Sequence, residues 1–172
     1  MLYIFVEGSD DEAYINRVFK HCFPNMIIIQ YAKMKKEKVL SFLRSILSIP
    51  DSDYLFLSDS DGLDTSSKKE YLLEIYPDLQ QEKMYIVHYE IESWYYAGLP
   101  QSESLKLKMK HYQEITDTLT KEQFDSKLSR PSDRLLIKSK ILDLYSLELA
   151  ITRNASLNLF YSDTKKETHA VC

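Results

Sequence analysis

Short apolar runs alternate with stretches of helical periodicity over the first hundred residues, and this alternation limits the chain to few folds. Four runs rich in Tyr, Ile, Val, Phe and Leu have the length and composition of β-strands. Between them, apolar residues recur every three to four positions, as on one face of an amphipathic helix. Such alternation is typical of βαβ units and a largely parallel sheet. The predicted strands are Leu2–Val6, Met26–Tyr31, Tyr54–Ser58 and Met84–Tyr89.

Proline marks the end of each helix predicted between these strands. Pro24 follows the first helical stretch, Pro50 the second, and Pro77 a third helix over Ser66–Tyr76. The sequence therefore predicts an α/β core over residues 1–98, with a mostly parallel central sheet of about four strands flanked by helices.

The pattern changes after residue 100. Helical spacing predicts a helix over Ser132–Tyr145, capped by Ser132, and another around Leu147–Ile151. The segment Leu105–Lys110 alternates apolar and basic residues and fits a helix or irregular structure equally well. Residues 99–172 are expected to form a mainly helical C-terminal extension packed on the same domain.

No apolar run approaches the roughly 20 residues that span a bilayer. The chain enters its first predicted strand without the basic and apolar regions of a secretory signal. We therefore expect a cytoplasmic protein with no membrane partner.

Charge is distributed unevenly. The net charge is −4, and residues 1–100 carry 10 Lys or Arg against 16 Asp or Glu, whereas residues 101–140 carry 9 against 6. The first part is suited to binding cations and the second to a phosphate backbone. The later basic residues form either a phosphate-contacting face or a solvated one: Lys106, Lys108, Lys110, Arg130 and Arg134.

Acidic residues directly follow predicted strands. Glu7 precedes Gly8 after the first strand, and Asp59-Ser-Asp61-Gly62 follows the third. Average usage of about 7% predicts roughly twelve glycines in this length, but the chain has 3. Using scarce glycines here indicates a tight turn or a close approach of backbone to a ligand. Since ligands bind beyond the carboxyl ends of strands in open α/β sheets, both turns are expected to share a site.

Carboxylates gathered at one edge repel one another unless a cation lies between them. Oxygen ligands without His or Cys select Mg²⁺, Mn²⁺ or Ca²⁺ over zinc. Two such ions are suited to phosphodiester chemistry. Asp and Gly are also ordinary turn residues, so each motif taken alone fits a solvated loop.

The two acidic motifs resemble those of the Toprim domain, which topoisomerases, primases and small nucleases share. They are Val6-Glu7-Gly8-Ser-Asp-Asp11 and Asp59-Ser-Asp61-Gly62. The later segment Glu90-Ile-Glu-Ser-Trp94 is more similar to the overcoming-lysogenization-defect nucleases and to short, uncharacterised Toprim-like proteins of prokaryotes. The resemblance covers about residues 1–98 and implies a Toprim-like Rossmannoid fold.

The resemblance also implies roles for single residues. Glu7 matches the family's general acid/base or metal-binding glutamate. Asp11 matches the second acid of that motif, which is often Glu in relatives and is one methylene shorter here. Asp59 and Asp61 match the Asp-x-Asp metal ligands.

In the nuclease branch a later acid completes a second metal site, and a C-terminal lysine stabilises the transition state. The acid corresponds to Glu92, with Glu90 beside it as a further ligand. The lysine corresponds to Lys138, with Lys140 as the alternative.

These assignments predict a nuclease that uses Mg²⁺ or Mn²⁺, as one or two ions, to hydrolyse DNA or RNA in prokaryotic genome defence. The alternative is a non-catalytic regulatory subunit that binds metal or phosphate in a complex with a partner ATPase or other nucleic-acid-processing protein. The chain has no G-x-x-x-x-G-K-[ST] motif, so nucleotide-driven control would come from that partner. A lysine at 138 or 140 directed at the carboxylates favours catalysis.

Trp94, the single tryptophan, has two interpretations. It is expected to be buried under the sheet as an apolar anchor rather than to stack on a nucleic-acid base.

Overall fold

The computed structural model describes residues 1–168, which divide into two compact units. The first unit runs from Met1 to Val87, and the second begins at His88. The sequence places the domain boundary later, after residue 98. The first unit holds the four strands, and the described part of the second contains helices, turns and loops.

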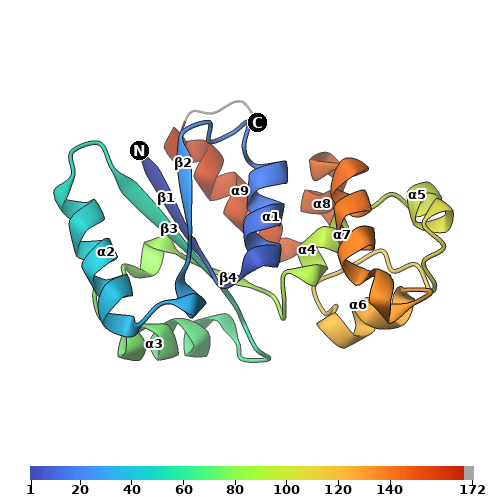
Figure 1. Ribbon diagram of the computed structural model, residues 1–172, viewed down its shortest axis with the longest axis horizontal. Coiled ribbons are helices and arrows are strands. Elements are labelled where there is room, and N and C mark those ends of the chain that lie inside the picture. The colour runs from blue at the N-terminus through green and yellow to red at the C-terminus, as the bar shows by residue number, and fades with distance from the viewer. Residues whose placement is uncertain (169–172) are drawn as a thin grey trace. The chain divides into compact units, whose positions relative to one another are not determined.

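Four parallel strands form one sheet in the first unit, in the order β2-β1-β3-β4 (Figure 1). The strands β2 and β4 therefore form the two edges. This α/β arrangement, with helices flanking the sheet and further helices towards the C-terminus, is Rossmann-like and confirms the predicted fold class. The strands are β1 (Leu2–Val6), β2 (Met26–Gln30), β3 (Asp53–Asp59) and β4 (Met84–Val87).

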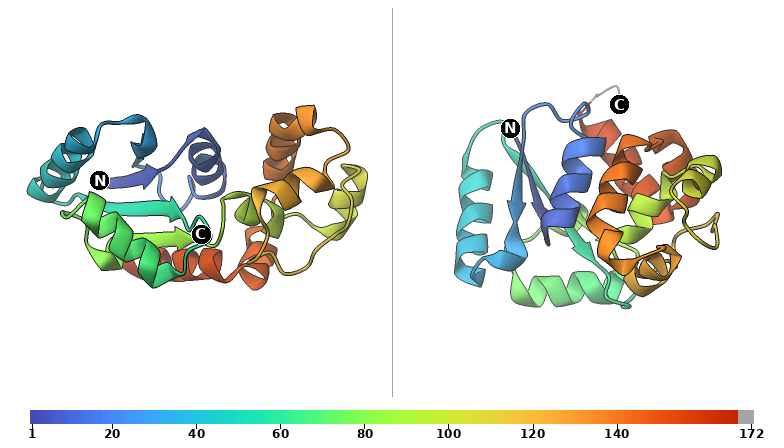
Figure 2. Two further views of the ribbon diagram at one scale, coloured as in Figure 1. Left: turned by 90° about the horizontal axis from the view of Figure 1, so that it is seen from below. Right: turned by 45° about the vertical axis from the view of Figure 1, so that its right-hand side comes forward.

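The helices of the first unit cover both faces of the sheet. The crossover from β1 to β2 and the crossover from β2 to β3 run in opposite directions, so right-handed connections place their helices on opposite faces. Figure 1 shows α1 on one side and α2 and α3 on the other, and the left view of Figure 2 shows β1, β3 and β4 running in the same direction. The helices are α1 (Ser9–Val18), α2 (Lys36–Ser48) and α3 (Thr65–Ile75), with short 3₁₀ turns at Tyr31–Lys33 and Gln81–Lys83.

Aromatic side chains fill the core between the sheet and the helices α2 and α3. The ring of Phe5 stacks on Phe56 at 5.7 Å between centroids and meets Tyr54 edge-on at 6.1 Å. The ring of Tyr31 lies 4.4 Å from Phe56. Alternation along a strand sends the intervening residues to the face that α1 covers. Those residues, all buried, are Ile4, Val6, Leu55 and Leu57.

The second unit contains more helices than the sequence predicts. The predicted helices after residue 130 correspond to α7 and α8. Ser132 does not cap α7, because Pro131 begins a 3₁₀ turn over Pro131–Asp133 and Asp133 is the residue that precedes the helix. The helices are α4 (Glu92–Ala97), α5 (Gln101–Lys106), α6 (Lys121–Lys127), α7 (Arg134–Asp143), α8 (Leu147–Arg153) and α9 (Ala155–Thr168).

Trp94 lies fully buried in α4, which confirms the predicted burial, but its indole packs against α9 of the second unit and not under the sheet as predicted. Its indole Nε1 donates a hydrogen bond to Ser156 Oγ at 2.8 Å, and its ring lies 5.5 Å from Phe160. As the single tryptophan, Trp94 makes intrinsic fluorescence a probe of the second unit.

Gly98 follows α4 at a point of close packing. A Cβ atom at this position would lie 2.3 Å from Cε2 of Tyr145. The Tyr145 ring is held by its hydroxyl, which donates to the carbonyl of Trp94 at 3.0 Å. The glycine is therefore required by the neighbouring ring and not by its own backbone angle, since φ is −84°.

Replacing Gly98 by alanine is expected to lower the free energy of unfolding of the second unit by about 1–3 kcal/mol, the usual cost of overpacking. Urea denaturation followed by Trp94 fluorescence measures the change. In a double-mutant cycle with Tyr145→Leu, the removal of the ring should recover most of the loss. An additive cycle would contradict a steric cause.

No helix in residues 1–168 is both long enough and apolar enough to cross a membrane.

Candidate functional site at the carboxyl edge of the sheet

Glu7 directly follows β1, and one of its carboxylate oxygens is held by three hydrogen bonds. Oε1 accepts from the Tyr31 hydroxyl at 3.0 Å, the Ser58 hydroxyl at 2.8 Å and the Asp59 backbone N–H at 3.1 Å. Its other oxygen, Oε2, accepts no hydrogen bond from the described residues. Three donors on one oxygen fix the orientation of the carboxylate.

Asp59 ends β3 and lies next to Glu7, since its own N–H is one of those three donors. The strands β1 and β3 are neighbours, paired at Phe5 with Phe56. The chain leaves β1 towards β2 on one side and returns to β3 on the other, so the strand order reverses between them. This switch point is where open α/β sheets form a crevice for ligands. The sequence prediction that these two acidic residues meet at one edge thus agrees with their positions.

Tyr31 donates to Glu7 as a neutral phenol. Burial raises the pKa of its hydroxyl far above the usual range, and the nearby Glu7 carboxylate raises it further. A phenol that cannot ionise near neutral pH remains a hydrogen-bond donor. Tyr31 therefore helps to hold the Glu7 carboxylate in place.

Asp61 projects from the turn after β3 and forms an ion pair with Lys68 of α3. Lys68 Nζ lies 2.5 Å from Asp61 Oδ2. The lysine side chain is only 5% exposed, whereas that of Asp61 is 64% exposed. Lys68 Nζ also lies 5.8 Å from the Tyr71 ring centroid. The carboxylate predicted to bind metal is thus already neutralised by a buried cation.

Asp11 closes the first turn of α1. Its Oδ2 accepts the N–H of Gly8 at 3.0 Å, which satisfies a donor at the start of the helix. Gly8 has an extended backbone, so no left-handed angle demands a glycine there, whereas Gly62 has φ +81° and fits the predicted tight turn. The role of Asp11 in metal binding stays a prediction.

The remaining predicted residues belong to the second unit. Glu90 Oε2 accepts the N–H of Lys121 at 2.5 Å, and burial followed by the nearby Glu92 raises the pKa of Glu90. Glu92 accepts from Lys138 Nζ at 2.7 Å and also pairs with Arg134. The Glu92 and Lys138 side chains are 4% and 3% exposed, so this is a buried ion pair.

Lys138 is therefore directed at a predicted carboxylate, Glu92, within its own unit. Lys140 instead lines a surface cleft between α5 and α7. A lysine directed at the predicted carboxylates favours catalysis, and Lys138 meets this condition only for Glu92. The catalytic role of Lys138 stays a prediction.

Within residues 1–168, no group of three or more His, Cys, Asp or Glu side chains is arranged to hold a metal ion. Glu7 and Asp59 are neighbours at this edge, and the charges of both carboxylates act on the Tyr31 hydroxyl. Mg²⁺ commonly binds proteins through one or two carboxylates and completes its shell with water and substrate phosphate. These two residues therefore fit one hard cation better than two.

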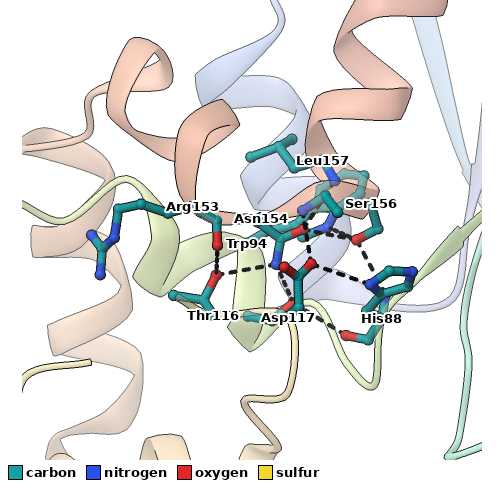
Figure 3. A network of polar contacts seen from close by, with 10 residues as sticks. His88, Trp94, Thr116, Asp117, Arg153, Asn154, Ser156 and Leu157 are labelled. Carbon is teal, nitrogen blue, oxygen red and sulfur yellow. Dashed lines mark hydrogen bonds and ion pairs between the residues drawn. The ribbon is translucent and has the colours of Figure 1, made fainter. Parts of the chain in front are cut away.

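A second polar cluster lies within the second unit (Figure 3). Asn154 Oδ1 accepts from the Leu157 N–H at 3.0 Å and the Ser156 hydroxyl at 2.8 Å, which caps the start of α9. Asp117 Oδ1 accepts the Ala155 N–H at 2.7 Å and lies 3.2 Å from Nδ1 of His88. These contacts satisfy backbone donors at a helix start. His88 thus takes part in this structural contact.

Several residues around these sites escape prediction from sequence. In the sequence, Tyr31 and Ser58 lie at the ends of two apolar runs that are distant from Glu7. Only the folded sheet brings their hydroxyls to the Glu7 carboxylate. Lys68 carries one usable signal, because it lies within the first turns of the helix that follows the Asp59 motif. Nothing in the sequence distinguishes Arg134 from a solvated arginine.

Comparisons of the chain with protein-family models, with curated proteins and with solved structures found no match in any of the three.

Proposed function

We propose that the chain binds Mg²⁺ or Mn²⁺ through Glu7 and Asp59 and hydrolyses phosphodiester bonds of DNA or RNA. The proposal rests above all on the Glu7 carboxylate, which three donors fix beside Asp59 at the switch point of the sheet. The Toprim resemblance of both acidic motifs supports it. Its setting would be the cytoplasm, in genome defence of a prokaryote.

In this proposal the residues of the site have different roles. Glu7 and Asp59 would hold the cation, and Tyr31 and Ser58 would keep the Glu7 carboxylate oriented. A bound ion would supply Lewis acidity and an activated water for attack on phosphorus. Lys68, buried beside Asp61, would offset the negative charge of that carboxylate and so lessen its repulsion of substrate phosphate.

The test is cleavage of single-stranded and double-stranded DNA and RNA with Mg²⁺ or Mn²⁺, combined with Mn²⁺ binding measured by electron paramagnetic resonance. We expect Glu7→Gln and Asp59→Asn each to abolish cleavage and to weaken Mn²⁺ binding by more than the roughly 10–100-fold seen for outer-shell partners. Glu74→Gln is the control, since Glu74 is an exposed acid on α3 of the same unit.

The outcomes separate the candidate functions. Retained Mn²⁺ affinity in both variants would refute the site itself. Mn²⁺ binding that depends on Glu7 and Asp59, without cleavage of any of the four substrates, would refute the nuclease and leave the binding subunit.

The second candidate is a regulatory subunit that binds metal or phosphate beside a partner ATPase. One observation favours it: predicted ligands are already engaged within the protein, Asp11 with Gly8, Asp61 with Lys68, and Glu92 with Lys138. A site with few available carboxylates is better suited to reversible binding than to a two-ion mechanism.

Replacing Lys68 by methionine is expected to raise the affinity for Mn²⁺ several-fold and to lower cleavage. The charge of Asp61 is then no longer offset by a lysine, so the site attracts a cation more strongly and repels substrate phosphate more strongly. The free energy of unfolding should change by less than about 1 kcal/mol, because an apolar side chain often replaces a buried charge at little cost when its partner is solvated. Mn²⁺ titration and urea denaturation measure the two effects, and unchanged metal affinity would contradict the role of Lys68.

A further inference from the structure

The helices α5 and α7 of the second unit border a cleft of about 270 Å³. Its floor is aliphatic, with the buried Met109 and Leu128 beside Leu107 and Ile137. Among residues 1–168, no aromatic side chain contributes to this lining. The cleft is therefore apolar at the base and has room for one or two large side chains of a partner.

Positive charge surrounds this floor. The side chains of Lys106, Lys108 and Lys140 line the cleft with a single acid, Asp133. Lys106 forms only an exposed ion pair with Glu103 on its own helix, and such pairs contribute little. The rim is therefore complementary to a negatively charged partner.

Large exposed apolar side chains lie on the two helices that border the cleft. Leu136, in the lining, is 55% exposed, and Leu135 on the same helix is 74% exposed. Leu105 on α5 is 68% exposed. Leu136 therefore adds an exposed apolar side chain to the cleft itself.

The spacing along α7 separates two faces of this helix. Asp133, Leu136, Ile137 and Lys140 recur at positions i, i+3, i+4 and i+7 and face the cleft. Lys138 faces the interior, where it pairs with Glu92. The cleft face of α7 thus has no role in the buried ion pair.

We infer that this cleft binds an acidic amphipathic helix of a partner protein. Aliphatic and methionine side chains are typical of grooves that accept the apolar face of a helix. Flanking lysines select acidic residues beside that face. Single-stranded nucleic acids are bound on aromatic platforms, which this lining lacks. The inference is independent of the proposed nuclease activity, since the cleft lies wholly within the second unit.

The probe is a fluorescein-labelled helical peptide with leucine at i, i+3, i+4 and i+7 and glutamate at most other positions. We expect it to bind the full chain, to bind more weakly as salt rises, and to shift the NMR signals of Leu107, Met109 and Leu128. Leu136→Ser should weaken binding about tenfold, as for a residue near the centre of an interface, and Lys140→Glu should weaken it by removing a complementary rim charge and should reduce its dependence on salt.

Matched controls are available on α9. Leu159→Ser changes a leucine that is 57% exposed, and Lys165→Glu makes the same charge reversal as Lys140→Glu. Both should leave the affinity unchanged.

Three results would overturn the inference. The first is binding of a peptide with lysine in place of glutamate as tightly as the probe. The second is displacement of the probe by oligothymidylate, which would assign the cleft to nucleic acid. The third is a change in the sedimentation of the free protein on Leu136→Ser, which would assign the cleft to a second copy of the chain.

Discussion

Replacing Glu92 by alanine is expected to lower the free energy of unfolding of the second unit by about 3–5 kcal/mol, the usual cost of removing one partner of a buried ion pair. The Lys138 ammonium lies 2.7 Å from the Glu92 carboxylate, and its side chain is 3% exposed. Arg134 loses the same acceptor. Urea denaturation followed by the fluorescence of Trp94 measures the loss directly, because this single tryptophan lies in the same helix as Glu92.

The control replaces both charges at once. The double variant Glu92→Leu with Lys138→Met should be nearly as stable as the wild type, since well-packed apolar residues often replace a buried pair without loss. A cost below about 1 kcal/mol for Glu92→Ala would instead show that the pair contributes little. Glu92 would then be free to change partners, as its predicted role in metal binding requires.

Replacing Arg153 by methionine is expected to destabilise the second unit by at least about 3 kcal/mol, because each buried carbonyl that loses its donor costs about 1–3 kcal/mol. The guanidinium, in a residue that is 3% exposed, donates to the carbonyls of Ala97 at 2.8 Å and Leu99 at 2.9 Å. It also donates to the carbonyls of Gln113 and Glu114. One side chain thus joins the end of α4 to the loop that precedes α6.

Arg153→Lys separates charge from geometry. Lysine keeps the positive charge at the end of α4 but has three donors on one atom in place of the planar fork of arginine. We expect an intermediate loss of stability, measured by the same denaturation. A lysine variant as stable as the wild type would show that charge alone suffices and that the separate carbonyl contacts do not matter.

The sheet is predictable from the sequence because its signals are local. The four strands are short apolar runs, and prolines limit the helices between them. Glu7 and Asp59 follow from the same pattern, since parallel strands end at the same edge. Long-range pairing then only has to bring neighbouring strands together.

The second unit is harder to predict because its helices are short and joined by irregular loops. α6 does carry a signal that sequence reasoning missed, a capping box in which Thr120 Oγ1 accepts the Gln123 N–H and the Gln123 side chain returns to the Thr120 N–H. The alternation in Leu105–Lys110 conceals α5, which ends at Lys106. Arg153 has no local signal, because its acceptors lie about 40 to 57 residues earlier in the chain.

The partners of Asp11 and Asp61 are likewise hard to predict from the sequence. Whether a carboxylate binds a cation, caps a helix or pairs with lysine depends on neighbours that spacing alone does not reveal. Asp11 accepts a hydrogen bond from a residue three positions away, and Asp61 from a residue seven positions away. Both spacings are equally compatible with solvated acidic side chains.

The strand β2 has a practical consequence for handling the protein. It forms one edge of the sheet, contains three consecutive isoleucines, and exposes 43% of Ile27. An edge strand of this composition presents unpaired backbone groups to a strand from another molecule. Concentrated or partly unfolded samples are therefore expected to aggregate through this segment. Replacing Ile27 by lysine should reduce this aggregation in crystallisation and NMR samples.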